Sequence, residues 1–173
     1  MTPPHFVSRS ENEPSSDERF MRECLREAAA AERAGEVPVG AVVVRDGQII
    51  GRGHNAPIGT NDPSAHAEIV ALRAAGASVG NYRLVGADLF VSVEPCLMCV
   101  GAVIQARVRR VVFGCTDPKA GALGGAPDLS RELGLNHRFT VRGHVCEAEA
   151  RQFLQRFFRR RRQDVEDRRV PKR

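Results

Sequence analysis

The sequence predicts an α/β sandwich, and two patterns along the chain support that prediction. Five short runs rich in β-branched residues are typical of strands. The last three of these runs alternate with segments whose apolar residues recur at helical spacing, which favours helices packed against a sheet. At 173 residues, 42% of them hydrophobic, the chain can bury one substantial core, so we expect a single domain.

The first expected helix is preceded by a capping signal. Ser15 and Glu18 have the spacing of a capping box, in which two side chains satisfy the free backbone N–H groups of a helix start. Apolar residues then recur at helical spacing up to Gly35. Residues 1–16 mix proline, serine and charge with little to bury, so we expect a disordered leader to a domain that spans residues 17–163.

A hairpin and a second helix follow. The β-branched runs at residues 38–44 and 48–54 are separated by Arg45-Asp46-Gly47, and Asp-Gly supplies the positive φ angles that a tight hairpin needs. These two strands are therefore expected to be antiparallel. After a loop, the alanine-rich residues 65–75 predict a helix that ends near Gly76, because glycine readily adopts the backbone conformation of a helix end.

The second half of the chain predicts three strands and two helices. The expected elements are a strand at 87–93, a helix at 96–106, strands at 109–115 and 139–145, and a helix from 147 to about 162. The last helix carries an apolar stripe that would pack it onto the core. Residues 164–173 are expected to form a basic flexible tail.

The net charge of +5 is unevenly distributed. Residues 151–173 hold ten arginines and lysines against three acidic residues, which gives this segment +7. The first 150 residues therefore carry 16 basic and 18 acidic side chains, or −2. The basic character belongs to the C-terminal segment, and it predicts a polyanionic partner for that region.

Cysteine usage and hydropathy indicate the compartment. No apolar run approaches the ~20 residues needed to cross a bilayer, and the N-terminal residues contain no apolar signal-peptide centre, so we expect a cytoplasmic protein without membrane contact. Five cysteines, an odd number that includes one CxxC pair, suit a reducing compartment better than a disulfide framework. Cys24, Cys115 and Cys146 stand in apolar surroundings and are expected to be buried thiols.

Three potential metal ligands occur in two short motifs, HAE at residues 66–68 and PCLMC at residues 95–99. Two cysteines separated by two residues at a helix start can direct both sulfurs at one ion, and the helix dipole helps keep them deprotonated. His66 brings the ligand count to three. Structural zinc sites usually have four protein ligands, whereas catalytic sites keep the fourth position for water. The count therefore favours a catalytic site made by His66, Cys96 and Cys99.

Each motif by itself has a plainer interpretation. A CxxC pair can be a redox centre, a histidine at a helix start is more often a packing residue than a ligand, and Glu68 alone would be a solvated first-turn acid. The combination is specific, because HxE followed by PCxxC is the established signature of zinc-dependent nucleobase deaminases. Glu68, beside a ligand but not on the metal, is the candidate group that moves protons.

From about Asp17 to Gln163 the sequence closely resembles the bacterial tRNA-specific adenosine deaminases. The segments that carry the resemblance are EVPVGAVVV, GHNAPIGTNDPSAHAEIVALR, NYRLVGADLFVSVEPCLMCVGAVIQARVRRVVFG, NHR and FFRRRRQ. The resemblance implies a cytidine deaminase-like fold, a three-layer α/β/α sandwich with a five-stranded mixed sheet, and a homodimer with one Zn²⁺ per subunit. It also implies hydrolytic deamination of the wobble-position adenosine to inosine in the anticodon stem-loop of an arginine tRNA.

The resemblance also implies a role for individual residues. His66, Cys96 and Cys99 would bind zinc, and Glu68 would be the general acid and base. The residues expected to contact the substrate are Asn55, Val37, Pro38 and the backbone N–H of Ala67 around the base, and Asp117, Lys119, Phe157, Arg159 and Arg160 near the RNA.

Some of these residues also have a plainer interpretation. Asn55 would otherwise be a turn-forming asparagine beside Pro57. In the tail, Phe157 and Phe158 are expected to dock the last helix, which leaves Arg159 to Arg162 for phosphates, the alternative being a solvated helix end.

Two other functions stay open at this point. A small-molecule deaminase acting on guanine or cytosine would use the same zinc chemistry, but a free base needs no arginine cluster. A zinc-stabilised RNA-binding protein without activity would have no need of Glu68. The tail and the HAE triplet therefore discriminate between the three functions.

Overall fold

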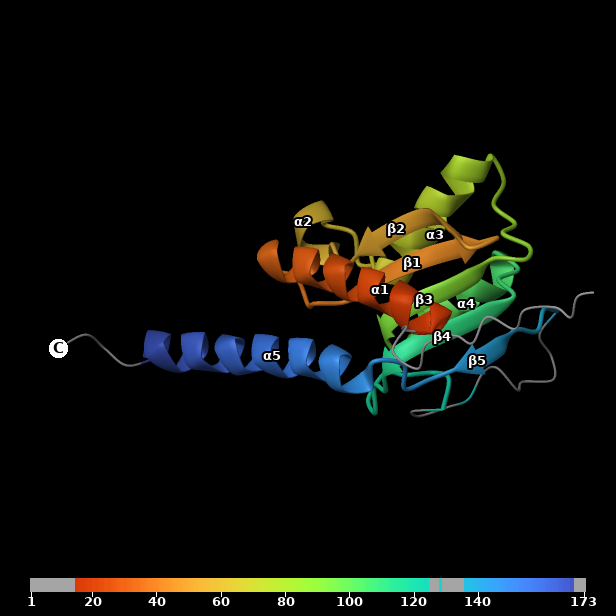
Figure 1. Ribbon diagram of the computed structural model, residues 1–173. Helices are drawn as coiled ribbons and strands as arrows, with labels where there is room; N and C mark the ends of the chain where they lie inside the picture. The colour runs from red at the N-terminus through yellow and green to blue at the C-terminus, as the bar shows by residue number, and fades with distance from the viewer. Residues whose placement is uncertain (1–14, 125–127, 129–135, 170–173) are drawn as a thin grey trace, which may run out of the picture.

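The structure is a computed structural model that describes residues 15–124, 128 and 136–169. Its centre is a five-stranded sheet with the strand order β2-β1-β3-β4-β5 (Figure 1). The strands are β1 (Gly40–Arg45), β2 (Gln48–His54), β3 (Asp88–Val93), β4 (Arg110–Cys115) and β5 (Thr140–Arg142). β1 is antiparallel to β2 and β3, whereas β3, β4 and β5 run parallel, so the expected mixed sheet is confirmed.

Helices cover both faces of this sheet. They are α1 (Ser16–Arg33), α2 (Pro57–Thr60), α3 (Ala67–Val79), α4 (Leu97–Gln105) and α5 (Glu147–Arg169). α1 and α5 lie on one face, and α3 and α4 lie on the other (Figure 1). Alternate residues of β1 divide between the two cores, because Val42 packs with the α1 cluster and Val43 with the α3 cluster. The three-layer α/β/α sandwich is therefore confirmed.

Two glycines in β2 set the position of α3, the helix that carries the HAE motif. A Cβ on Gly51 would lie 2.4 Å from the carbonyl oxygen of Ala71, and one on Gly53 would lie 2.5 Å from that of Ala67. No side chain fits at either position, so the backbone of β2 packs directly on α3. This close approach fixes where the first turn of α3 begins relative to the sheet.

The local signals for the first helix and the hairpin are confirmed. The Ser15 hydroxyl accepts the Glu18 N–H at 3.3 Å, and the Glu18 carboxylate accepts the Ser15 N–H at 3.3 Å, which completes the capping box. Asp46 and Gly47 both have positive φ angles, 52° and 75°, as a two-residue hairpin turn requires. Of the leader predicted for residues 1–16, residues 1–14 lie outside the described part of the chain, and Ser16 already belongs to α1.

The helix ends were predicted less well. α3 does not stop near Gly76; it continues to Val79 and ends at Gly80, whose φ is 65°. Val79 packs against the core, and this tertiary contact supports the extra turn. α5 continues to Arg169, so residues 164–169 of the predicted flexible tail are helical, and the remaining residues 170–173 lie outside the described part.

Two further elements differ from their predicted extent. The loop after β2 contains the one-turn helix α2, which begins at Pro57, a residue pre-organised for a helix start. β5 spans only three residues, Thr140–Arg142, instead of the predicted 139–145. None of the described helices is long and apolar enough to cross a membrane.

Candidate metal and RNA-binding site

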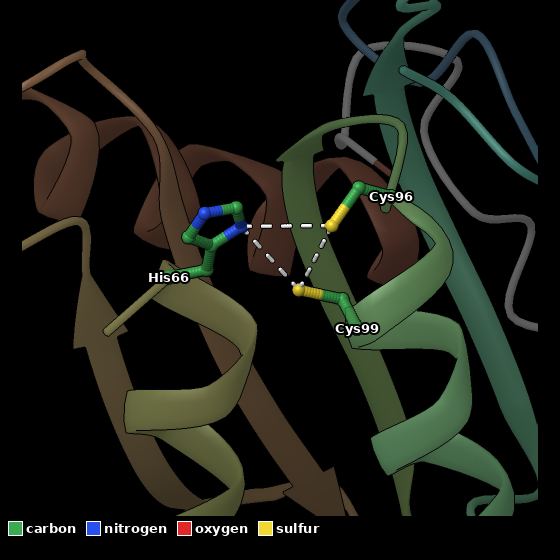
Figure 2. Close-up of side chains that lie close together, drawn as sticks. All are labelled: His66, Cys96 and Cys99. Carbon is green, nitrogen blue, oxygen red and sulfur yellow. Dashed lines mark hydrogen bonds between the residues drawn. The ribbon is translucent and has the colours of Figure 1, made fainter. Parts of the chain in front are cut away.

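The predicted metal ligands lie where two helices of the same face begin. His66 is the residue before the first turn of α3, Cys96 is the residue before the first turn of α4, and Cys99 lies within that turn. Figure 2 shows the imidazole and the two thiols directed at a common point. The cluster therefore joins segments that lie 30 residues apart in the chain.

The spacing of the three ligand atoms is that of a tetrahedral zinc site. His66 Nδ1 lies 3.6 Å from both sulfurs, and the two sulfurs lie 3.7 Å apart. Tetrahedral angles and ordinary zinc bond lengths require about 3.6 Å between nitrogen and sulfur and about 3.8 Å between two sulfurs. The three residues thus fit one Zn²⁺ and leave its fourth position for a non-protein ligand.

Hydrogen bonding within the cluster favours one thiolate. Bonds with Cys99 and His66 lower the pKa of Cys96 to about 4. The same contact raises the pKa of His66, and the bond to Cys96, together with burial, raises the pKa of Cys99. A thiolate is the form of cysteine that binds a metal, so the cluster is electrostatically prepared for a cation.

Glu68 is a buried acid in the first turn of α3, not a solvated one. Only 4% of its surface is exposed, and burial raises the pKa of its carboxyl group to about 6. The Glu68 backbone N–H and the Cys99 thiol lower this pKa and so oppose the effect of burial, and Glu68 is not a member of the three-ligand cluster. Glu68 therefore lies beside the metal position with a carboxyl group that titrates close to neutral pH.

Asn55 caps the N-terminus of α3 in place of the N-cap residue, His66. His66 occupies the N-cap position, but its ring faces the two cysteines and makes no cap hydrogen bond. Instead Asn55 Oδ1 accepts the backbone N–H of Ala67 at 2.9 Å. In this structure the Ala67 N–H is used by Asn55, and its contact with the base stays a prediction.

A groove of about 980 Å³ lies at the carboxyl ends of β3 and β4 and runs along α5. It brings together four residues that were predicted to contact the substrate, namely Val37, Asp117, Lys119 and Arg159. Pro38, predicted beside Val37, is buried and does not line the groove. The groove also contains residues that the sequence did not single out for contact with a substrate, among them Thr116, Arg151, Leu154 and Gln155.

The two phenylalanines of the tail have different environments. Phe157 is 7% exposed, so its predicted role in docking α5 is confirmed, but its ring is not available at the surface for RNA. Phe158 is 45% exposed and lines the groove, so the prediction that it docks the helix is wrong. Consecutive helical residues point about 100° apart, so one ring is buried and the other exposed although their centroids lie only 5.5 Å apart.

The arginine run also divides between two faces of α5. Arg159 and Arg162 line the groove. Arg156 and Arg160 instead face α1 and pair with the Glu32 carboxylate, at 3.1 Å from Arg156 Nε and 3.2 Å from Arg160 Nη1. The prediction that Arg160 contacts phosphate is not supported by this placement. A continuous run of arginines has no periodicity, so nothing in the sequence distinguished these faces.

Comparison with known proteins places the chain in a family. Residues 14–115 match the family described as the cytidine and deoxycytidylate deaminase zinc-binding region. The tRNA-specific adenosine deaminase of Haemophilus influenzae is 45% identical over 149 residues, which cover 86% of each chain. The chain belongs to the tRNA-specific adenosine deaminase family. As a member of a zinc-binding deaminase family with a His, Cys, Cys cluster, it carries the ligands for one Zn²⁺ per subunit.

Solved structures give the same fold and two substrate classes. One, from a study of A-to-I editing by tRNA:A34 deaminases at the wobble position of transfer RNA, has 41% identity and a TM-score of 0.77, and the match covers 79% of this chain and 99% of that one. A guanine deaminase from Nitrosomonas europaea has 26% identity and a TM-score of 0.70, with 91% and 97% covered. The family shares its scaffold with enzymes that act on free bases.

Proposed function

We propose that this protein is a zinc-dependent enzyme that converts adenosine to inosine by hydrolysis at the wobble position of a tRNA anticodon. The observation that carries the proposal is the three-ligand cluster with the buried Glu68 beside it. Membership of the tRNA-specific adenosine deaminase family supports the choice of substrate.

Glu68 is the group that we assign to proton transfer. When bound, Zn²⁺ activates water as a nucleophile near neutral pH. The Glu68 carboxylate takes one proton from the attacking water and delivers it to ring nitrogen N1. It then takes the proton of the hydroxyl group added at C6 and delivers it to the amino group, which leaves C6 as ammonia. Water and adenosine are thereby converted to inosine and ammonia. A carboxyl group with a pKa of about 6 can accept and release a proton at neutral pH.

Asn55 and Val37 are proposed to hold the base. Because Asn55 Oδ1 accepts the Ala67 N–H, the side-chain NH₂ of Asn55 is the group that remains to donate to a base nitrogen or oxygen. Val37 lines the groove and offers an apolar wall. An unpaired base in an anticodon loop can rotate into such a site at a cost of roughly a few kcal/mol. This cost is smaller than that of extruding a paired base.

The groove along α5 is proposed to bind the anticodon stem-loop. Lys119, Arg159 and Arg162 line it and supply positive charge for phosphates, while the exposed ring of Phe158 offers a surface on which a base can stack. RNA loops are recognised through splayed bases and backbone contacts, and this groove offers groups for both.

A homodimer and a cytoplasmic location complete the proposal. Leu97 and Met98 at the start of α4 are 65% and 39% exposed, and an apolar groove of about 590 Å³ lies between α3 and α4. Exposed apolar surface of this kind supports a self-association face. Sedimentation equilibrium of the zinc-loaded protein tests the dimer.

The cytoplasmic location follows from a tRNA substrate and from cysteines suited to a reducing compartment.

The test of the function is inosine formation in anticodon stem-loops. Zinc-loaded protein should convert a wobble adenosine in an arginine tRNA stem-loop and leave adenosines at other loop positions unchanged, as measured by mass spectrometry of the digested nucleosides. Failure to form inosine in any tRNA stem-loop would exclude the proposal. The likeness to guanine deaminase makes release of ammonia from free guanine the second assay, and rapid turnover there would favour a free-base enzyme.

A further inference from the structure

We propose that Glu94 is a positioning residue that holds the loop after β4 against the metal-binding motif, and that RNA affinity depends on this attachment. The loop comprises residues 116–123, and we refer to it as loop 116–123. The role in RNA binding rests on the proposed function, whereas the attachment itself rests on contacts in this structure.

The Glu94 carboxylate accepts hydrogen bonds from both ends of loop 116–123. Glu94 follows β3 directly, and only 4% of its surface is exposed. Its Oε2 accepts the Asp117 N–H at 3.1 Å, and its Oε1 accepts the Leu123 N–H at 2.9 Å. One side chain therefore closes a loop whose ends are six residues apart, and it does so with two separate acceptor oxygens.

Further contacts connect the loop to the metal-binding motif beside Glu94. The Ala122 N–H donates to the Pro95 carbonyl at 3.0 Å, and Gly121 forms an isolated β-bridge with Cys96, a metal ligand. A Cβ on Gly121 would lie 2.4 Å from Glu94 Oε2. The loop backbone thus packs directly on the carboxylate, at a position where no side chain fits.

Asp117 connects the residues held by Glu94 with the wall of the groove. Asp117 Oδ1 accepts the Lys119 N–H at 2.9 Å and the Ala120 N–H at 3.2 Å, so the turn that presents Lys119 starts from the residue that Glu94 holds. Asp117 and Lys119 both line the groove, whereas Glu94 does not. Glu94 therefore influences the shape of one groove wall without being positioned to contact RNA.

The substitution Glu94→Gln tests this role in the zinc-loaded protein. Glutamine has the same shape but replaces one acceptor oxygen with an NH₂ group, so one loop N–H loses its partner. We expect hydrogen exchange at the Asp117 and Leu123 amides to become about tenfold faster, as the loss of one buried hydrogen bond allows. KM for the anticodon stem-loop should rise about tenfold while kcat stays within about twofold. Zinc should remain at one ion per chain.

Two controls and a second variant make the test specific. Glu149→Gln changes an exposed glutamate of α5 and should alter neither hydrogen exchange in the loop nor KM. Gly121→Ala places a Cβ on the loop that pushes the loop away from the Glu94 carboxylate. It should therefore reproduce both effects while Glu94 keeps its two acceptor oxygens. Gly101→Ala is its control, since a Cβ there has no neighbour within 4 Å.

Several results would overturn the inference. Loss of zinc in Glu94→Gln would assign Glu94 to the support of the metal motif instead, and unchanged hydrogen exchange with unchanged KM would remove it from the loop altogether. If Glu94→Gln fails to fold, Gly121→Ala decides between these outcomes. Hydrogen exchange and zinc content need no substrate, so they report on the attachment even if the wild-type protein forms no inosine.

Discussion

Asn55 Oδ1 accepts the backbone N–H of Ala67 at 2.9 Å, across twelve residues of sequence, and thereby caps the helix that carries His66 and Glu68. The histidine at the N-cap position cannot serve as the cap because its ring faces the metal position. A substrate-binding candidate is thus also a structural support, and the two roles use different atoms of one amide.

Substitutions of Asn55 should separate these roles. Asn55→Asp keeps an acceptor for the Ala67 N–H but has no NH₂ group, so we expect wild-type thermal stability with kcat/KM lowered by about ten- to a hundredfold. Asn55→Ala loses the cap as well and should cost about 1 kcal/mol of unfolding free energy. Thermal melting and steady-state kinetics check both variants, and full activity of Asn55→Asp would restrict Asn55 to the structural role.

Glu68→Gln should abolish turnover without releasing zinc. The amide has nearly the same volume as the carboxyl group, but it cannot carry a proton between water and the base, and general acid–base catalysis contributes about a hundredfold to ten-thousandfold in rate. Metal analysis of the purified variant should give one zinc per chain, as for the wild type. A variant that loses its zinc would instead identify Glu68 as a ligand.

Removal of zinc should make the metal-binding Cys96 reactive towards a thiol reagent and leave the buried cysteines unreactive. After chelation, a thiol reagent at pH 8 should label Cys96 first, because it is half-buried and hydrogen-bonded as a thiolate. Cys24 and Cys115 should stay unlabelled in the folded protein, because both are buried and burial raises the pKa of Cys115 to about 11. Mass spectrometry of labelled peptides checks the order, and labelling of Cys115 before Cys96 would contradict it.

The arginines of α5 should differ in their contribution to RNA binding. Each phosphate contact adds roughly 0.7 to 0.9 to the slope of log affinity against log salt, so Arg159→Gln should lower the slope by about that amount. Arg160→Gln should leave the slope unchanged, because Arg160 pairs with Glu32 on the other side of the helix. Filter binding of a stem-loop at several salt concentrations measures both, and equal slopes for the two variants would refute the division.

Glu32 should give a small, pH-dependent contribution to stability. Its hydrogen bond with Arg156 lowers the pKa of the Glu32 carboxyl group below its ordinary value of 4.5. The stabilisation is therefore present above the unfolded pKa and is lost as the pH falls through the folded pKa. Glu32→Gln should be less stable than the wild type at pH 7 by at most about 1 kcal/mol, as for exposed ion pairs. Denaturant unfolding should show this difference disappear in acid, and a difference that persists at pH 3 would point to packing.

Residues close in sequence were the ones that could be assigned in advance. The capping box of Ser15 and Glu18, the hairpin at Asp46 and Gly47, and the CxxC pair all depend on partners within four positions. Backbone geometry alone brings such partners together. The prediction that the helix ends near Gly76 was wrong for a related reason. Glycine permits a helix to end but does not require it, and the packing of Val79 against the core favours the longer helix.

The sequence by itself determined the five strands and four of the five helices, though not all of their ends, and it singled out the three metal ligands and Glu68, because these follow from local spacing and from a motif of known chemistry. Only the tertiary structure decided which arginines face the groove, that Phe158 and not Phe157 is exposed, that Asn55 caps α3 and that Glu94 holds loop 116–123. These pairings join residues between 12 and 128 positions apart, and no periodicity in a chain specifies which distant groups will meet when it folds.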